Sequence, residues 1–343
     1  MHRRFLTPVF LAVVAPFMTG TSTAAPQATS APPATAASQP RPATDRLVML
    51  GTGGGPIPRV GRSQPAHLVQ AGGKAYLIDV GAGTARQLVR AGVRPSIVDA
   101  VFITHQHLDH TAGIMEFVAL DWTDRRQAPV VFYGPPGTRQ LVTDTVGALR
   151  TGETLFRLEI PGLPLMASVF SGKDLEVTTT AREVYRDEVV TVRAVENSHY
   201  VTMKLPMTEH GIDRSYSYRF DLPARSIVFT GDTGPSRAVE DLAKGADLLV
   251  SEMIDLESVV GALRKRQAAT GIDQQPLIDH MVQEHLTPEN VGRLAAAAGV
   301  RKVVITHIGT SPGIEAINRE AILADVHKHY AGPVEISEDL AVY

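Results

Sequence analysis

A concentration of metal-binding side chains directly after a short apolar stretch is the most constraining feature of this chain. Residues 98–103 are typical of a buried strand, and residues 104–110 then hold three histidines and one aspartate. No packed core needs that density of imidazole and carboxylate groups, so the cluster is predicted to lie on the loop that leaves the strand. Small residues open a predicted helix at 111–120. Imidazole nitrogen and carboxylate oxygen together suit zinc, with manganese or iron as alternatives.

Further chemistry-bearing residues follow predicted strands in order along the chain. Together with the His-x-His-x-Asp-His run, they resemble the signature of the metallo-β-lactamase superfamily, and the resemblance covers residues 46 to 343. It implies an α/β class with a four-layer αββα sandwich. The stretches are Ala75–Gly81 with Asp79, Val195–His199, Ser226–Thr233 with a Gly-Asp-Thr turn, and Lys302–His307.

The same resemblance implies a site with two zinc ions per chain. Two cations a few ångströms apart can share one water and lower its pKa toward neutrality, which makes a hydrolytic nucleophile. Asp79 is expected to orient a ligand without binding metal itself. Asp109 is expected to be both a ligand and a catalytic residue. The implied ligands are His105, His107 and His199 on one ion, Asp109, His110 and His307 on the other, and Asp232 between them.

One more segment narrows the branch of the superfamily. Glu284–Val291 resembles the histidine-containing segment of the ribonuclease Z and arylsulfatase-like branch, in which the histidine hydrogen-bonds the reacting oxygen. The resemblance gives that role to His285. Taken alone, His285 could equally be a surface residue before a helix capped by Thr287. One departure is Ser251, which stands where ribonuclease Z has a histidine before the glutamate and puts that enzyme's proton relay in doubt.

The N-terminal composition predicts export from the cytoplasm. A basic start, an apolar stretch too short to span a membrane and small residues at 22–24 indicate a signal peptide over 1–24. Residues 25–44 are rich in Ala, Pro, Ser and Thr and are predicted to form a disordered linker. Residues 45–343 are expected to form one hydrolase domain, periplasmic or secreted, with no stable membrane anchor in the mature form. The chain has no cysteine, which excludes disulfides and thiolate ligands.

Charge gives no sign of a nucleic-acid partner. The formal net charge is −3. Ribonuclease Z carries a tRNA-binding arm between its first histidine cluster and the next ligand, and the corresponding residues 151–200 hold five Lys or Arg against eight Asp or Glu. An enzyme that acts on nucleic acid is expected to carry a basic stripe that neutralises the phosphates. We therefore expect a small-molecule ester substrate and not a nucleic acid. A homodimer is common in the superfamily.

Strand and helix patterns alternate along the chain, in agreement with the α/β class. The loop Gly51–Gly55 lacks the spacing of a nucleotide-binding loop, and we expect it to allow close backbone approach to the metal site. Residues 253–285 are predicted to form a partly helical lid, or equally an inert surface excursion. Strands are predicted at 46–50, 66–70, 75–80, 98–103, 129–133, 189–195, 216–220, 226–230, 247–251 and 302–306, and helices at 83–91, 111–120, 137–149, 235–243, 288–298 and 314–328.

The leading functional expectation is a secreted binuclear zinc hydrolase that cleaves a sulfate or phosphate ester, like arylsulfatases and phosphodiesterases. An acyl hydrolase of the lactonase or β-lactamase type is the alternative. Two minor alternatives are a ribonuclease Z-like 3′-tRNA endonuclease and a metal-binding protein without turnover. Pocket walls decide between substrates, and fold-level likeness alone is analogy.

Overall fold

The computed structural model describes residues 45–311 and 316–343. The predicted signal peptide and linker, residues 1–24 and 25–44, lie outside the described residues. Strands alternate their side chains between two buried faces, as strand geometry requires. In the first strand, Val48 and Leu50 enter one core while Leu47 and Met49 enter another. Such strands need cover on both sides, which explains why their sequences are apolar almost throughout.

The first sheet has six strands, in the order in which they occur in the chain. Its first three strands are antiparallel, and the others run parallel to the third. The carboxyl ends of its parallel strands therefore lie at one edge. The strands are β1 (Arg46–Gly51), β2 (Ala66–Ala71), β3 (Lys74–Ile78), β4 (Ala100–Phe102), β5 (Val130–Gly134) and β6 (Phe170–Asp174).

The second sheet has seven strands in the order β13-β12-β11-β10-β9-β8-β7. Strands β10 to β13 are parallel, while β7 to β10 are joined by antiparallel pairs. The strands are β7 (Arg182–Arg186), β8 (Thr191–Glu196), β9 (Tyr216–Asp221), β10 (Ser226–Phe229), β11 (Leu248–Ile254), β12 (Val303–Gly309) and β13 (Val334–Ile336).

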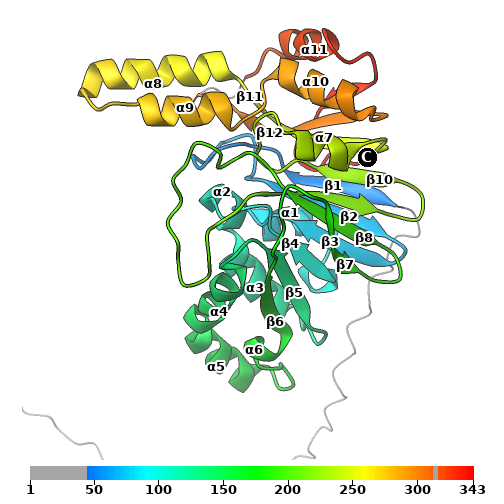
Figure 1. Cartoon of the computed structure of the whole chain (residues 1–343). Coiled ribbons are helices and arrows are strands. Elements are labelled where there is room, and N and C mark those ends of the chain that lie inside the picture. The colour runs from blue at the N-terminus through cyan, green and yellow to red at the C-terminus, as the bar shows by residue number, and fades with distance from the viewer. Residues whose placement is uncertain (1–44, 312–315) are drawn as a thin grey trace, which may run out of the picture. The chain divides into compact units, whose positions relative to one another are not determined.

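The two sheets pack face to face through an aromatic core. The ring of Phe102 lies 5.7 Å from that of Tyr218 and 5.1 Å from that of Phe220, between centroids, so strands of both sheets meet there. Helices cover the outer face of each sheet (Figure 1), which confirms the four-layer αββα sandwich. The first sheet is covered by α1 (Thr84–Arg90), α3 (Ile114–Thr123), α4 (Thr138–Ala148) and α6 (Met166–Val169), and the second by α7 (Arg237–Ala243), α10 (Pro288–Ala298) and α11 (Arg319–His327).

The remaining helices lie in connections. The 253–285 segment is partly helical, as predicted, and contains a hairpin of α8 (Leu256–Thr270) and α9 (Gln275–Gln283) that extends away from the sheets (Figure 1). Among the described residues, no helix is both long enough and apolar enough to cross a membrane. The other short helices are the 3₁₀ turn η1 (Pro95–Ile97), α2 (Leu108–Thr111) and α5 (Arg150–Glu159).

Candidate metal centre and its catalytic histidine

Loops at the ends of strands from both sheets deliver the predicted site residues. The loop after β4 carries the histidine cluster into α2, and a loop after β8 carries His199. Asp232 follows β10, and His307 lies within β12. Ligands of α/β proteins commonly bind beyond the carboxyl ends of strands. The structure therefore brings all seven predicted metal ligands to one place, although their binding of metal stays a prediction.

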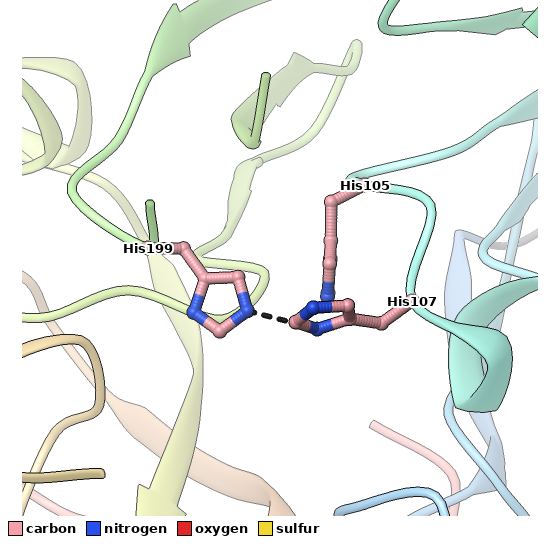
Figure 2. A group of neighbouring side chains, drawn as sticks. All are labelled: His105, His107 and His199. Carbon is pink, nitrogen blue, oxygen red and sulfur yellow. Dashed lines mark hydrogen bonds between the residues drawn. The ribbon is translucent and has the colours of Figure 1, made fainter. Parts of the chain in front are cut away.

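The first predicted ligand group is His105, His107 and His199 (Figure 2), whose ring nitrogens lie within 4.8 Å of one another. Nδ1 of His107 is 3.1 Å from Nε2 of His199. His105 has its Nδ1 on the hydroxyl of Thr104, 3.0 Å away, which leaves Nε2 for the centre. Burial is the main cause that lowers the pKa of His105 and His199 well below the usual range. Both rings are thus neutral, as metal ligands must be.

The second predicted group is Asp109, His110 and His307, whose donor atoms also lie within 4.8 Å of one another. Nε2 of His307 is 3.4 Å from Oδ2 of Asp109. Asp79 takes the supporting position expected of it, because its carboxylate accepts from Nδ1 of His110 at 2.8 Å and from the backbone N–H of Thr104 at 2.7 Å. Asp79 has φ 57° and His307 has φ 43°, so the site holds two non-glycine residues in a costly backbone conformation.

Asp232 lies between the two groups. Its carboxylate is 3.1 Å from Nε2 of His307 and 3.4 Å from Nε2 of His110. On the other side, the same carboxylate is 3.9 Å from Nε2 of His105 and 4.0 Å from Nε2 of His199. Burial opposes its ionisation, but His307 and His110 hold the pKa of Asp232 well below its usual value. A charged carboxylate that reaches both groups has the geometry of a bridging ligand.

Buried ligand atoms without hydrogen-bond partners give a second, independent indication that the donor set could hold cations. Among the described residues, Nε2 of His105, Nε2 of His110 and Oδ1 of Asp232 are buried without a hydrogen-bond partner. An unpaired buried polar atom is costly, and three of them aimed at one space need an explanation. Two divalent cations coordinated there would satisfy all three atoms. The residues present therefore fit the metals that the sequence predicts.

Sequence reasoning missed the partner of His285. His285 is buried, and its Nδ1 lies 2.8 Å from Oε2 of Glu252, a fully buried residue of β11. The other oxygen of Glu252 accepts from the backbone N–H of Thr233 at 2.7 Å. Although burial opposes protonation, Glu252 raises the pKa of His285 to about 9. Thr287 caps α10 as predicted, but His285 is no surface residue.

Ser251 does not disturb the His285–Glu252 pair. Its hydroxyl donates to the backbone carbonyl of Glu252 at 2.9 Å, and the carboxylate of Glu252 remains on His285. The departure from the ribonuclease Z pattern at this position therefore leaves the histidine–glutamate pair in place. In the sequence alone, Glu252 stands out only as the acidic residue that follows Ser251.

Two glycines allow the backbone to approach the centre closely. A Cβ at Gly54 would lie 2.7 Å from Nδ1 of His307, which confirms the predicted use of the 51–55 loop. A Cβ at Gly234 would lie 1.9 Å from the carbonyl oxygen of Gln283, two residues before His285. The turn after Asp232 and the segment that carries His285 can touch only because Gly234 has no side chain.

Substituting Gly234 by alanine should slow hydrolysis by about 100-fold, because a displacement of about 1 Å at a reacting group costs that much. The added methyl group must push the backbone of Gln283 away and His285 with it. Steady-state rates and metal content measure the effect, and metal content should not change. Gly147→Ala is the control, because a Cβ there meets nothing within 4 Å. A normal rate in Gly234→Ala would show that the close approach does not position His285.

Comparison with known proteins decides the family. The family model described as "Beta-lactamase superfamily domain" matches residues 74–308, a range that contains every predicted metal ligand and the His285–Glu252 pair. The chain belongs to the β-lactamase superfamily.

Relatives within the superfamily identify the branch. Ribonuclease Z of Mycobacterium avium is 30% identical over 299 residues, which are 86% of this chain and 96% of the relative. Ribonuclease Z of Mycobacterium bovis is 29% identical, and the match again covers 86% of this chain and 96% of the relative. Among solved structures, the metallo-beta-lactamase fold protein YhfI from Bacillus subtilis has a TM-score of 0.61 at 17% identity, covering 87% of this chain and 98% of its own. Human tRNase Z, short form, has a TM-score of 0.59 at 20% identity, and the match covers 87% of this chain and 98% of the human chain.

These findings confirm the superfamily, the fold and a metal-dependent hydrolase that acts on ester bonds. They overturn two functional expectations. The expected hydrolase of small sulfate or phosphate esters, with an acyl hydrolase as its alternative, is wrong for a chain whose relatives include ribonuclease Z enzymes. The expectation of a small-molecule ester substrate in place of a nucleic acid is wrong for the same reason. The error came from averaging charge over the chain and over residues 151–200. Net charge conceals a local basic cluster, and exposed Arg264, Lys265 and Arg266 lie together on α8.

Proposed function

We propose that the protein is a zinc-dependent endonuclease of the ribonuclease Z kind, which hydrolyses a phosphodiester bond of precursor tRNA. The observation that carries this proposal is the extent of the ribonuclease Z likeness, 86% of the chain and 96% of the relative. The fold of human tRNase Z agrees with it. Zinc is favoured because five imidazoles and two carboxylates form the donor set. The solved Zn²⁺-bound PqqB from Methylobacterium extorquens shares the fold, with a TM-score of 0.56.

Each residue of the site has a distinct task in this reaction. His105, His107, His199, Asp109, His110, His307 and Asp232 would hold two cations. When bound, such cations lower the pKa of water and polarise the phosphoryl group. Asp79 fixes the ring of His110 through Nδ1, so that Nε2 faces the centre. His285, held by Glu252, presents its Nε2 as a general acid to the leaving oxygen.

A cleavage assay on the full chain tests the proposal. A precursor tRNA transcript with a 3′ trailer should be cut at a single site, cutting should stop with a chelator, and added zinc should restore it. Bis(p-nitrophenyl) phosphate serves as a second substrate that needs only the phosphodiester chemistry. Hydrolysis of this small diester without RNA cleavage would reject the endonuclease, and failure on both substrates would reject the phosphodiesterase altogether.

The α8–α9 hairpin is the proposed RNA-binding element. Arg264, Lys265 and Arg266 are exposed on α8, and α9 leads directly into the segment of His285. Substituting all three basic residues by glutamine should weaken RNA binding and lower the slope of log K against log salt by about 2, since each phosphate contact contributes about 0.7 to 0.9. Hydrolysis of the small diester should not change, because none of the three is a predicted site residue.

Filter binding of the transcript at several salt concentrations measures that slope. The matched control is Arg139→Gln with Arg150→Gln, two exposed arginines on α4 and α5 at the far end of the domain from α8 (Figure 1). An unchanged slope in the α8 variant, or an equal loss in the control, would show that RNA does not lie on the hairpin.

A further inference from the structure

A second histidine–glutamate pair lies beside the centre, and none of the roles assigned above uses it. His280, in the last turn of α9, has its Nδ1 on the carboxylate of Glu284. Glu284 is fully buried, and its other oxygen accepts from the backbone N–H of Thr202 at 2.5 Å and from the Thr202 hydroxyl. The carboxylate is thus fixed from two separate segments. It holds the ring of His280 in one orientation.

The ring of His280 is close to the residues that would perform catalysis. Its centroid lies 5.3 Å from that of His285 and 5.1 Å from that of His199. Ring nitrogens of these three histidines lie within 4.8 Å of one another. The backbone carbonyl of Glu284 also accepts from Nδ1 of His199 at 3.1 Å, so the same residue positions a predicted ligand and His280. The side chain of His280 is 13% exposed, which leaves it within reach of a bound molecule.

The hydrogen-bonding pattern determines what His280 can contact. A carboxylate only accepts, so it takes the Nδ1 proton, and in the neutral ring Nε2 is then an acceptor. Within residues 45–311 and 316–343, no side chain or backbone group hydrogen-bonds to this Nε2. A phosphate oxygen has no proton to give to such an atom. A sugar hydroxyl has one, and the 2′-hydroxyl is the group by which proteins distinguish RNA from DNA.

We propose that His280 is a specificity-determining residue whose Nε2 accepts a hydrogen bond from the ribose 2′-hydroxyl beside the scissile phosphodiester, with Glu284 as its positioning residue. The inference rests on the proposed RNA-cleaving function. It extends that function by assigning the choice of RNA over DNA to a residue of α9. His285 acts on the leaving oxygen, and His280, one ring away, contacts the neighbouring sugar.

Two substrates and one variant test this contact as a thermodynamic cycle. The substrates are a short precursor tRNA transcript and the same RNA with a single 2′-deoxynucleotide on the 5′ side of the scissile bond. For the wild-type holoenzyme, removing the hydroxyl should lower kcat/KM by about 10-fold, the effect of one neutral hydrogen bond with a partner left unpaired. His280→Ala should lose about 10-fold on the RNA and nothing further on the deoxy substrate.

A purely structural role for His280 gives a different result. The variant would then lose the same factor on both substrates, and that outcome would overturn the proposal. His280→Gln offers an amide oxygen as acceptor and should restore part of the selectivity, while His329→Ala, after α11, should behave as wild type. Zinc content should match wild type in all three variants. If wild-type protein cleaves neither RNA, the proposed function itself fails and the inference fails with it, a result distinct from equal losses on two cleaved substrates.

Discussion

Replacing Asp232 by asparagine should reduce zinc content to one ion or fewer per chain and slow phosphodiester hydrolysis by at least ~1,000-fold. The carboxylate of Asp232 lies within 4.0 Å of ring nitrogens from both predicted ligand groups. An amide has almost the same shape but carries no charge to balance two cations. Stabilisation of charge in the reacting state depends on both cations, so the loss falls on the chemical step. Metal analysis and steady-state rates measure the two effects together.

Asp241→Asn is the control for this substitution. Asp241 is an exposed carboxylate of α7 that pairs with Arg237, so its loss should change neither zinc content nor rate. Two bound zinc ions and a normal rate in Asp232→Asn would show that the bridge is not needed. The assignment of Asp232 would then be wrong.

Removing the imidazole of His285 should lower kcat by about 100- to 10,000-fold, the range expected for a general acid, without loss of zinc. Glu252→Gln should give a smaller loss and should also move the basic limb of the pH profile to lower pH. The direction of this shift follows from the contact between His285 and Glu252. Glu252 raises the pKa of His285, so the protonated acid persists as pH rises. Without that charge, the proton is lost at lower pH.

Metal content and a pH–rate profile from pH 6 to 10 separate these effects. Glu240→Gln on α7 is a suitable control, because this carboxylate pairs with exposed Arg237. A His285→Ala variant that loses zinc would make His285 a ligand instead of an acid. An unshifted basic limb in Glu252→Gln would mean that His285 does not set that limb.

The sandwich, and the gathering of the predicted site residues at one place, were predictable because they depend on local patterns. Residues 98–110 combine a buried strand with a ligand-rich loop, and the structure places them as β4, a loop and α2. Asp232 follows the end of β10, and His307 lies in the second half of β12, so both predicted ligands come late in or just after a buried strand. Thr287 was predicted to cap the helix that begins at residue 288, and the structure has it as the N-cap of α10.

The missed elements lack such patterns. Strand β6 has the sequence Phe-Ser-Gly-Lys-Asp, and its only buried residue is Phe170. The sequence therefore shows no alternation of apolar and polar residues that would predict a strand. Strand β7 is an edge strand without a buried residue. The partner of His285 was missed for another reason. Glu252 contacts His285 across 33 residues, and such a pairing is set by tertiary packing alone.

Both sheets contribute predicted ligands to the same candidate metal centre, and this has a consequence for the stability of the protein. His105 and His107 leave the first sheet, whereas Asp232 and His307 belong to the second. Ions bound there would therefore cross-link the halves of a chain that has no cysteine to do so. Binding to the folded state alone adds about 2.7 kcal/mol per ion at a hundredfold excess over Kd. Metal-free molecules would not persist as folded, inactive enzyme. They would unfold more often and be degraded, so metal supply would set the amount of enzyme as well as its rate.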